Sequence, residues 1–290
     1  MAKKIQETPT NLTREELSNL SKVTTDVFFF SLFCYVIHPV RGKVRFELYP
    51  YQKAVLYQFI LQRFNILLKF RQAGITELIS MYCLWLASYH PNKKINIISI
   101  KDTTAKKVLK KIKFMYKNLP WYMQTPIING RTGEFGSASM IEFDNGSFIE
   151  SIPTSSEAGR SESLSLLVID EAAIVRWASA IWAAAFPTLS TGGSAIINST
   201  PYGMGNFYHS TWVDAIAGGN PFNAIRLYWQ MHPERDQSWY DQMASALGPK
   251  RTAQEIDGDF LSSGNTVFDM ADIKAIEDCL SDYPVLKYRF

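Results

Sequence analysis

The stretch from Asn65 to Leu78, NILLKFRQAGITEL, constrains the fold of this 290-residue chain more than any other motif in it. An apolar run from Ile66 to Leu68 predicts a buried strand, and a polar turn containing Gly74 follows it. Thr76 then opens an apolar-periodic segment that predicts a helix. Strand, turn and helix in this order are the layout of a phosphate-binding loop, in which backbone N–H groups at a helix N-terminus surround phosphates.

This loop departs at two positions from the usual pattern G-x-x-x-x-G-K-[ST]. Ile75 stands where the lysine is expected, and Lys69 replaces the first glycine. A loop folded round an anion also brings its first residue near the β- and γ-phosphates, so Lys69 can supply the missing charge. Arg71 is a second cation within reach, and Thr76 has a hydroxyl that would hold Mg²⁺. Taken alone, the pattern leaves open a solvated Lys-x-Arg before a helix.

Short apolar segments alternate with helical ones along the rest of the chain. KINIISI, LSLLVID and SAIINST predict buried strands with helices between them. This order predicts an α/β fold with a mostly parallel central sheet flanked by helices on both faces. Alternation on both sides of Asn145-Gly146 predicts a small β-hairpin insertion. The apolar run from Val27 to Ile37 is shorter than the roughly 20 residues of a membrane span, and we interpret it as a buried helix.

Composition restricts the function only mildly. The chain is 47% hydrophobic and 20% charged, which is ordinary for a globular protein. A net charge of +3 permits an anionic partner without demanding one. The three cysteines and four histidines are dispersed, so they predict a reducing compartment and no metal cluster.

Two carboxylates, Asp170 and Glu171, end the predicted strand LSLLVID. In an open α/β sheet, ligands bind at the carboxyl edge of the strands. A bound Mg²⁺ would explain two adjacent acids there, with Asp170 holding the metal through water and Glu171 orienting and deprotonating the attacking water. The alternative is an Asp-Glu pair that caps the next helix.

Three further positions are candidates. Ser199 and Thr200 end another buried strand at the same edge, where they could contact the γ-phosphate region and report hydrolysis; a plain turn is the alternative. Gln52 has a donor and an acceptor that can pair with an adenine edge, or it is a surface glutamine. Arg160, in the polar loop SEAGRSES, could reach a neighbouring subunit's phosphate as an arginine finger, or it is a solvated loop residue.

Lysines are concentrated between residues 101 and 117. Helical spacing spreads them over more than one face, so we interpret them as a solvated helix face, with contact to a DNA backbone as the alternative. The set is Lys101, Lys106, Lys107, Lys110, Lys111, Lys113 and Lys117.

Taken in order, LYPYQ, KFRQAGIT, LSLLVIDEAA and INSTPYGMGNFYH resemble the ATPase domain of large terminase subunits, the DNA-packaging motors of tailed bacteriophages. The likeness is closest to the T4-like branch. It extends to FFFSLFCYVIHPVRGKVRFELYPYQ, IEFDNGSFI and QEIDGDFLSSGNTVF, and covers most of residues 25–268. It implies an ASCE-type P-loop ATPase fold with ATP and Mg²⁺ as cofactors. The departure is Ile75, although some terminases carry a lysine at the first loop position, as Lys69 does here.

The resemblance also implies roles for single residues. Gln52 matches the adenine-reading glutamine, and Asp170 and Glu171 match the metal-binding and catalytic acids. Arg160 matches an arginine proposed to act in trans, with Arg71 as the alternative in cis. Ser199 and Thr200 match the coupling motif. The nucleotide-binding loop would comprise Lys69, Arg71, Gln72, Ala73, Gly74, Ile75, Thr76 and Glu77, with Thr76 and Asp170 on the metal.

The implied function is ATP hydrolysis that drives translocation of double-stranded viral DNA into a procapsid. The implied partners are double-stranded DNA, the portal protein and procapsid, and the small terminase subunit. The chain would also assemble with further copies into a ring on the portal, or be a monomer in isolation. The setting would be the host cytoplasm, away from membranes and outside the mature virion. We expect an N-terminal helical extension at 1–45, a P-loop ATPase core at 46–262, and at 263–290 the start of a linker to an absent nuclease domain. No nuclease activity is expected.

Other functions remain open on the sequence. A superfamily 2 helicase-like DNA translocase shares the glutamine and the Asp-Glu pair, but it needs a second RecA-like lobe, for which the chain is too short. A second alternative is a nucleotide- or DNA-binding module that does not hydrolyse ATP. It is supported by Ile75, which stands where the loop lysine is expected. A nuclease would need a second acidic cluster at a sheet edge, and the sequence shows none.

Overall fold

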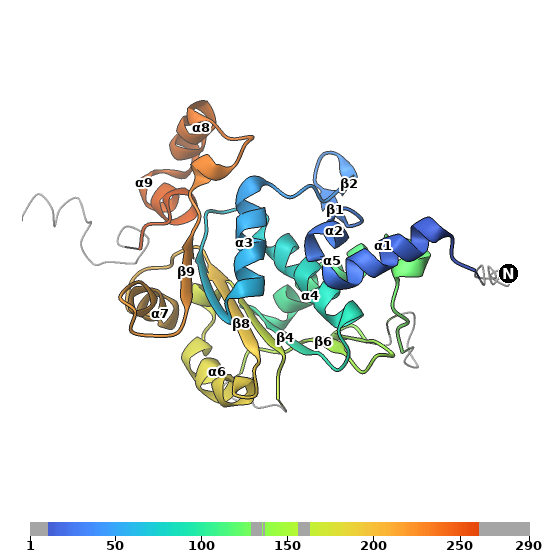
Figure 1. Ribbon diagram of the computed structural model, residues 1–290. Coiled ribbons are helices and arrows are strands. Elements are labelled where there is room, and N and C mark those ends of the chain that lie inside the picture. The colour runs from blue at the N-terminus through green and yellow to red at the C-terminus, as the bar shows by residue number, and fades with distance from the viewer. Residues whose placement is uncertain (1–10, 129–134, 136, 156–162, 261–290) are drawn as a thin grey trace, which may run out of the picture.

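The computed structural model describes residues 11–128, 135, 137–155 and 163–260, and a seven-stranded sheet lies at its centre (Figure 1). Its strands lie in the order β5-β6-β4-β7-β8-β3-β9, and every neighbouring pair is parallel except β5 and β6. This confirms the predicted α/β class with a mostly parallel sheet. The strands are β3 (Phe64–Leu68), β4 (Lys94–Ile98), β5 (Met140–Glu142), β6 (Phe148–Ser151), β7 (Leu166–Asp170), β8 (Ser194–Ser199) and β9 (Asn223–Arg226).

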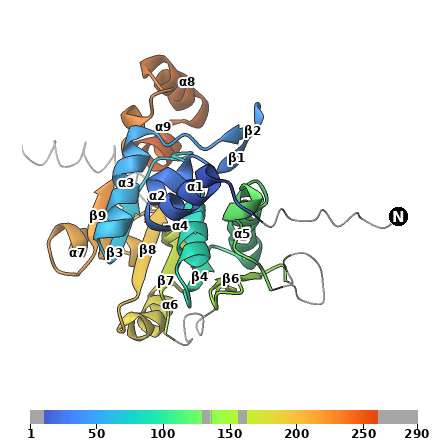
Figure 2. The same ribbon diagram turned by 45° about the vertical axis from the view of Figure 1, so that its right-hand side comes forward.

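Helices cover both faces of the sheet, because its strands are apolar on both sides (Figures 1 and 2). Along β7, Leu166 and Val168 point into one core, and Leu167 and Ile169 point into the other. This alternation follows from the two-residue period of a strand. The first core is closed by α1 (Arg14–Thr25), α2 (Val27–Ser31), α3 (Pro50–Leu61), α4 (Ile75–Tyr89) and α5 (Asp102–Lys117); the second by α6 (Ala178–Ala185) and α7 (Phe207–Ile216).

The predicted helix over Val27–Ile37 is wrong in its second half. The helix α2 ends at Ser31, and β1 (Tyr35–His38) then pairs antiparallel with β2 (Gly42–Arg45). Ile37 is 64% exposed, so the apolar run is not a continuously buried segment. The cause is a partner strand: Tyr35-Val36-Ile37 is aromatic and β-branched, which suits a strand once another strand is available to pair with it.

The predicted hairpin around Asn145-Gly146 is present and is continuous with the central sheet. β5 and β6 are its arms, and β6 pairs parallel with β4. Gly146 has φ of +79°, and a Cβ there would lie 2.4 Å from Asn92 Oδ1, so the turn requires glycine. The Asn145 amide donates to the Ala87 carbonyl oxygen at 2.9 Å, which ties the turn to the end of α4. The hairpin therefore forms the edge of the main sheet.

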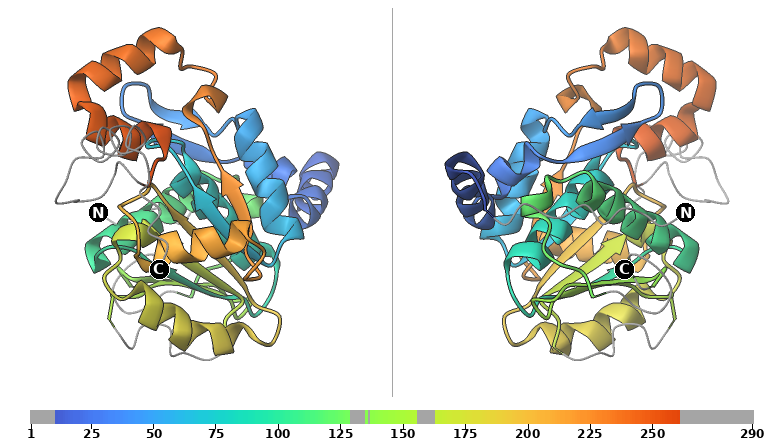
Figure 3. Two further views of the ribbon diagram at one scale, coloured as in Figure 1. Left: turned by 90° about the vertical axis from the view of Figure 1, so that its left-hand side faces the viewer. Right: turned by 90° about the vertical axis from the view of Figure 1, so that its right-hand side faces the viewer.

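The C-terminal part of the described chain turns back over the strand ends. After β9 come α8 (Gln237–Leu247), α9 (Pro249–Thr252) and a π-helical turn at Ala253–Asp257. Figure 3 shows these helices on the same side of the sheet as β1 and β2. Among the described residues, no helix is long and apolar enough to cross a bilayer. The expected linker at 263–290 lies outside the described residues.

Candidate functional site

The predicted phosphate-binding loop connects β3 to α4 and has a strained, tightly braced backbone. Its first residue is tied to the sheet, since the Lys69 N–H donates to the Ser199 carbonyl oxygen at 3.1 Å. Gln72 and Gly74 have φ of 60° and 69°. A Cβ on Gly74 would lie 2.5 Å from the Gln52 amide nitrogen, so both the conformation and the space require glycine there.

Gln52 is a buried brace for this loop. Its Oε1 accepts from the Tyr49 N–H at 3.0 Å, and its Nε2 donates to the Ala73 carbonyl oxygen at 3.1 Å. The Tyr51 hydroxyl donates to the same carbonyl at 2.8 Å. Gln52 thus lies buried against the loop, with its amide bonded to the protein. The adenine-reading role stays a prediction.

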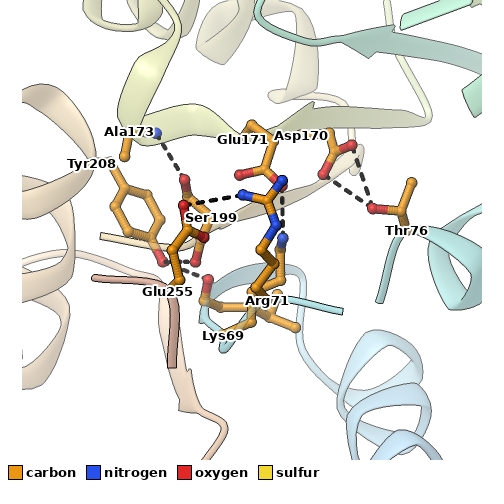
Figure 4. A network of polar contacts seen from close by, with 10 residues as sticks. Lys69, Arg71, Thr76, Asp170, Glu171, Ala173, Ser199, Tyr208 and Glu255 are labelled. Atoms are coloured by element: carbon orange, nitrogen blue, oxygen red, sulfur yellow. Dashed lines mark hydrogen bonds and ion pairs between the residues drawn. The ribbon is translucent and has the colours of Figure 1, made fainter. Parts of the chain in front are cut away.

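The structure brings the loop cation and the acid pair together at the carboxyl edge of the sheet (Figure 4). Lys69 Nζ lies 2.8 Å from Glu171 Oε1, and the Lys69 side chain is only 7% exposed. The Thr76 hydroxyl donates to the Asp170 carboxylate, 3.4 Å from each oxygen. Burial raises the pKa of Asp170 above its usual range, and nearby Lys69 opposes this shift while Glu171 adds to it.

Glu171 holds an uncommon conformation for a non-glycine residue, with φ of 56° and ψ of 43°. Such conformations cost of order 1 kcal/mol or more and gather at functional sites. The turn that follows is tied to the end of β8, because the Ala173 N–H donates to the Ser199 hydroxyl at 3.2 Å. The buried Tyr208 hydroxyl donates to the carbonyl oxygens of Leu67 and Ser199. The acid pair, β8 and β3 are therefore linked through one polar network.

Arg71 contacts the C-terminal segment at Glu255. Its Nη1 lies 3.0 Å from Glu255 Oε1, its N–H donates to the Glu255 carbonyl oxygen at 2.7 Å, and its side chain is 68% exposed. Arg235 donates to the carbonyl oxygens of Arg71 at 3.2 Å and of Gln72 at 3.4 Å. Its guanidinium lies over the ring of Trp239 at 4.3 Å. Sequence reasoning gave no role to Glu255 or Arg235, although Glu255 stands in the stretch QEIDGDFLSSGNTVF.

A cavity of about 940 Å³ opens above the loop, and its size is within the range of small-molecule sites. Residues 69 and 71–77 line it together with Glu171 and Thr200. The β1–β2 hairpin and the C-terminal segment complete the wall, a contribution that sequence reasoning did not foresee. The additional cations and rings include Arg41, Arg45, Lys111, His232, Arg235 and Trp239.

Two of the predicted loop residues line the cavity but have side chains that are engaged elsewhere. Ile75 is 1% exposed and belongs to the core, so a lysine is absent from the usual position and Lys69 is the buried cation of this site. Glu77, in the first turn of α4, forms an ion pair with Lys111 of α5. Arg160 lies outside the described residues.

The oxygen donors at this edge suit a hard divalent cation. Mg²⁺ prefers carboxylate and hydroxyl oxygens and commonly uses one or two protein ligands, with water and substrate phosphates filling the rest. Thr76 and Asp170 offer such a set at the mouth of the loop. Within the described part of the chain, no group of three His, Cys, Asp or Glu residues could hold a metal by itself.

The fold and the strand order define the class: an α/β protein with the ASCE-type P-loop fold. The family model described as "Terminase large subunit, T4likevirus-type, N-terminal" matches residues 66–275, and the chain belongs to this family. The terminase large subunit of Thermus phage G20c is 30% identical over 130 residues, a match that spans 39% of this chain and 26% of that protein.

Solved structures show the same fold. The large terminase ATPase domain of Thermus phage P74-26 is 20% identical with a TM-score of 0.56, covering 74% of this chain and 95% of that one. The large terminase of a second thermophilic bacteriophage, in complex with ADP, is 13% identical with a TM-score of 0.60, covering 74% of this chain and 54% of that one.

Proposed function

We propose that this chain binds ATP and Mg²⁺ and hydrolyses the γ-phosphate, and that this hydrolysis drives translocation of double-stranded viral DNA into a procapsid. The observation that carries the proposal is the contact between Lys69 and Glu171 across the mouth of a loop-lined cavity. The family supports it, as do the structural relatives, which include the second thermophilic phage's large terminase in complex with ATP-gamma-S and with ADP. Residues 46–262 would form the ATPase core between an extension at 1–45 and the linker start at 263–290.

The phosphates would lie on the N–H groups of the loop and of the first turn of α4. Lys69 is the cation buried closest to the sheet edge, and it is engaged by Glu171 in this structure. Entry of a γ-phosphate would offer Lys69 a stronger anionic partner. Glu171 would then lose its partner and become available as a base.

Glu171 would take a proton from the attacking water at a carboxylate oxygen, aligning that water for in-line displacement. Thr76 and Asp170 would hold Mg²⁺, which would supply positive charge against the negative charge that develops on the phosphates. Arg71 in cis, or Arg160 of a neighbouring copy in trans, would stabilise the charge of the transition state. Ser199 and Thr200, at the end of β8, would change their contacts when the γ-phosphate is lost.

The packaging partners belong to this proposal as well. They are double-stranded DNA, the portal and procapsid, the small terminase subunit and further copies in a ring, all in the host cytoplasm. Because the protein would hold DNA mainly through its phosphates, translocation would tolerate any DNA sequence and would weaken as the salt concentration rises. A nuclease activity is not proposed for this chain.

The test measures phosphate release from ATP with Mg²⁺, with and without duplex DNA, for the natural chain and for Glu171→Gln. We expect turnover by the natural chain and a loss of about 10²–10⁴-fold in the variant, with ATP binding retained, because the glutamine keeps the shape but removes the base. Turnover unchanged by Glu171→Gln would remove Glu171 from its role. Nucleotide binding without turnover in the natural chain, even with DNA and at high protein concentration, would favour the non-hydrolysing module.

A further inference from the structure

The helix α5 concentrates positive charge far beyond the chain average. Over 16 residues, Asp102–Lys117, it carries six lysines and one aspartate, a formal net charge of +5. The whole chain has a net charge of only +3, so the remainder is net acidic. A surface of this sign on such a background indicates an anionic partner.

The six lysines of α5 separate into two groups in the structure. Lys106 pairs with Asp102 at 2.6 Å, Lys111 pairs with Glu77, and Lys113 Nζ donates to the Ser137 carbonyl oxygen at 2.6 Å. These lysines serve intramolecular contacts.

The other group is exposed and shares one face of the helix. Lys107, Lys110 and Lys117 are exposed, at spacings of three and seven residues, which place them on one face. Lys107 and Lys110 form no ion pair with any residue that the structure describes. Lys117 lies over the Phe135 ring at 5.0 Å from its centroid.

The β1–β2 hairpin continues this face. Lys43 Nζ donates to the Asn118 side-chain oxygen at 3.0 Å, and Asn118 is the residue that ends α5. Three exposed lysines of α5, Lys107, Lys110 and Lys117, with Lys43 at the end of the helix, make up a row that we name the α5 stripe. Its α5 part extends about 15 Å, given a rise of about 1.5 Å per residue. One strand of duplex DNA presents a phosphate about every 3.4 Å of helix axis, so the row can span several phosphates.

We propose that the α5 stripe contacts the phosphates of double-stranded DNA. This inference rests on the proposed function and assigns a surface to its DNA partner. The sequence alone favoured a solvated face because helical spacing spreads the lysines over more than one face. The structure weakens that objection, since Lys106, Lys111 and Lys113 are bonded to the protein. The exposed lysines Lys107, Lys110 and Lys117 share one face of the helix.

The position of α5 also favours DNA over another anionic partner. The Glu77–Lys111 ion pair joins α5 to the first turn of α4, one residue beyond Thr76. The helix that carries the stripe is therefore bonded, through Lys111, to the helix that begins at the nucleotide loop. A DNA motor must transmit conformational changes from its nucleotide-binding site to the surface that holds DNA, and this ion pair offers a short structural connection between the two.

The experiment compares Lys107→Ala/Lys110→Ala with a matched control, Arg14→Ala/Lys53→Ala, which removes two exposed cations from α1 and α3. Binding to a fluorescein-labelled duplex of mixed sequence is followed by anisotropy over a range of NaCl concentrations. We expect the stripe variant to lose roughly tenfold in affinity for each lysine at about 0.1 M salt, and its log–log salt slope to fall by about 2. The control should match the natural chain, and basal ATP hydrolysis without DNA should be unchanged in both variants.

Other results separate the stripe from the proposed function. If the natural chain binds duplex DNA and the stripe variant binds it with the same affinity and salt slope, the stripe is wrong and the proposed function stands. If the natural chain hydrolyses ATP but binds no DNA at any salt concentration, the stripe and the DNA partner both fall. A thermal melt shows that each variant is folded, and Lys43→Ala provides an independent variant outside the helix.

Discussion

Two helices, α4 and α8, line the same cavity but are held in the molecule very differently. Eleven of the fifteen residues of α4 are buried, whereas none of the eleven residues of α8 is. α4 carries Thr76 to the sheet edge, and α8 brings Trp239 to the opposite wall. Local opening becomes easier as buried apolar contacts become fewer, so the α8 wall should open at a much lower free energy than the α4 wall.

The two cations of the loop repeat this contrast two residues apart. Lys69 is 7% exposed and pairs with an acid of the sheet edge, whereas Arg71 is 68% exposed and pairs with Glu255 of the outer wall. An exposed ion pair contributes about 0–1 kcal/mol, whereas breaking a buried one can cost about 3–5 kcal/mol. Lys69 and Glu171 are thus fixed to the core. The Arg71–Glu255 contact, which joins the loop to the outer wall of the cavity formed by residues 232–255, costs little free energy to break.

Among the variants that compare these two cavity walls, Lys69→Met should have the largest effect, because it removes the charge and keeps an apolar stem. Affinity for a non-hydrolysable ATP analogue with Mg²⁺ should fall about 30-fold, because a charge-assisted hydrogen bond contributes about 1.5–3 kcal/mol. Isothermal titration calorimetry measures it, with Lys53→Met on the exposed side of α3 as the control. Unchanged affinity in Lys69→Met would show that the first loop position does not replace the missing lysine at Ile75.

His232, where the chain turns toward the outer wall, should make stability depend on pH. It is 8% exposed, and its Nδ1 accepts from the Glu234 N–H at 3.2 Å, a bond that protonation would break. Burial lowers the pKa of His232, and Arg235 lowers it further. The unfolded chain then binds this proton at a higher pH than the folded one, so the free energy of unfolding falls as pH drops below about 6.5.

His232→Gln should flatten that fall in stability on the acid side. Urea unfolding at a series of pH values measures the free energy of unfolding of the natural chain and of the variant, and the difference between the two is followed against pH. That difference should change between about pH 6.5 and the lowered pKa of the folded state, and stay constant above. A difference that is the same at every pH would mean that His232 titrates alike in both states.

The smallest effect concerns the Arg71–Glu255 pair. A double-mutant cycle of Arg71→Ala and Glu255→Ala should give a coupling free energy below about 1 kcal/mol in urea unfolding, because the guanidinium is largely exposed. A coupling free energy above about 2 kcal/mol would contradict the contrast drawn above, since the α8 side of the cavity would then be held as firmly as the α4 side.

The parts of the site that the sequence predicted are those written in consecutive residues. The loop that begins at Lys69 and the pair Asp170-Glu171 each end a strand with an apolar pattern, and a parallel sheet necessarily brings such ends to one edge. Their contact follows from the fold class, and the structure shows it at 2.8 Å. The chemical roles of these residues stay predictions.

The parts that were missed depend on partners far away in the chain. Glu255 meets Arg71 across 184 residues, and nothing local marks either Glu255 or Arg235 for this task. α8 has no fully buried residue, and Trp239, Tyr240, Met243 and Leu247 pack only partly buried against the first core. The helix predicted over Val27–Ile37 failed for a related reason: only pairing with β2 shows that Tyr35–His38 is a strand.

The order of strands in the sheet also affects how the chain is made. Lys69 and Glu171 are 102 residues apart, and β8, which lies between their strands, is made later than both. Contacts this distant along the chain form slowly, because a long loop must close first. A growing chain on the ribosome therefore displays its loop cations well before their acidic partners exist. Only a chain extended beyond Glu255 can close the cavity seen here.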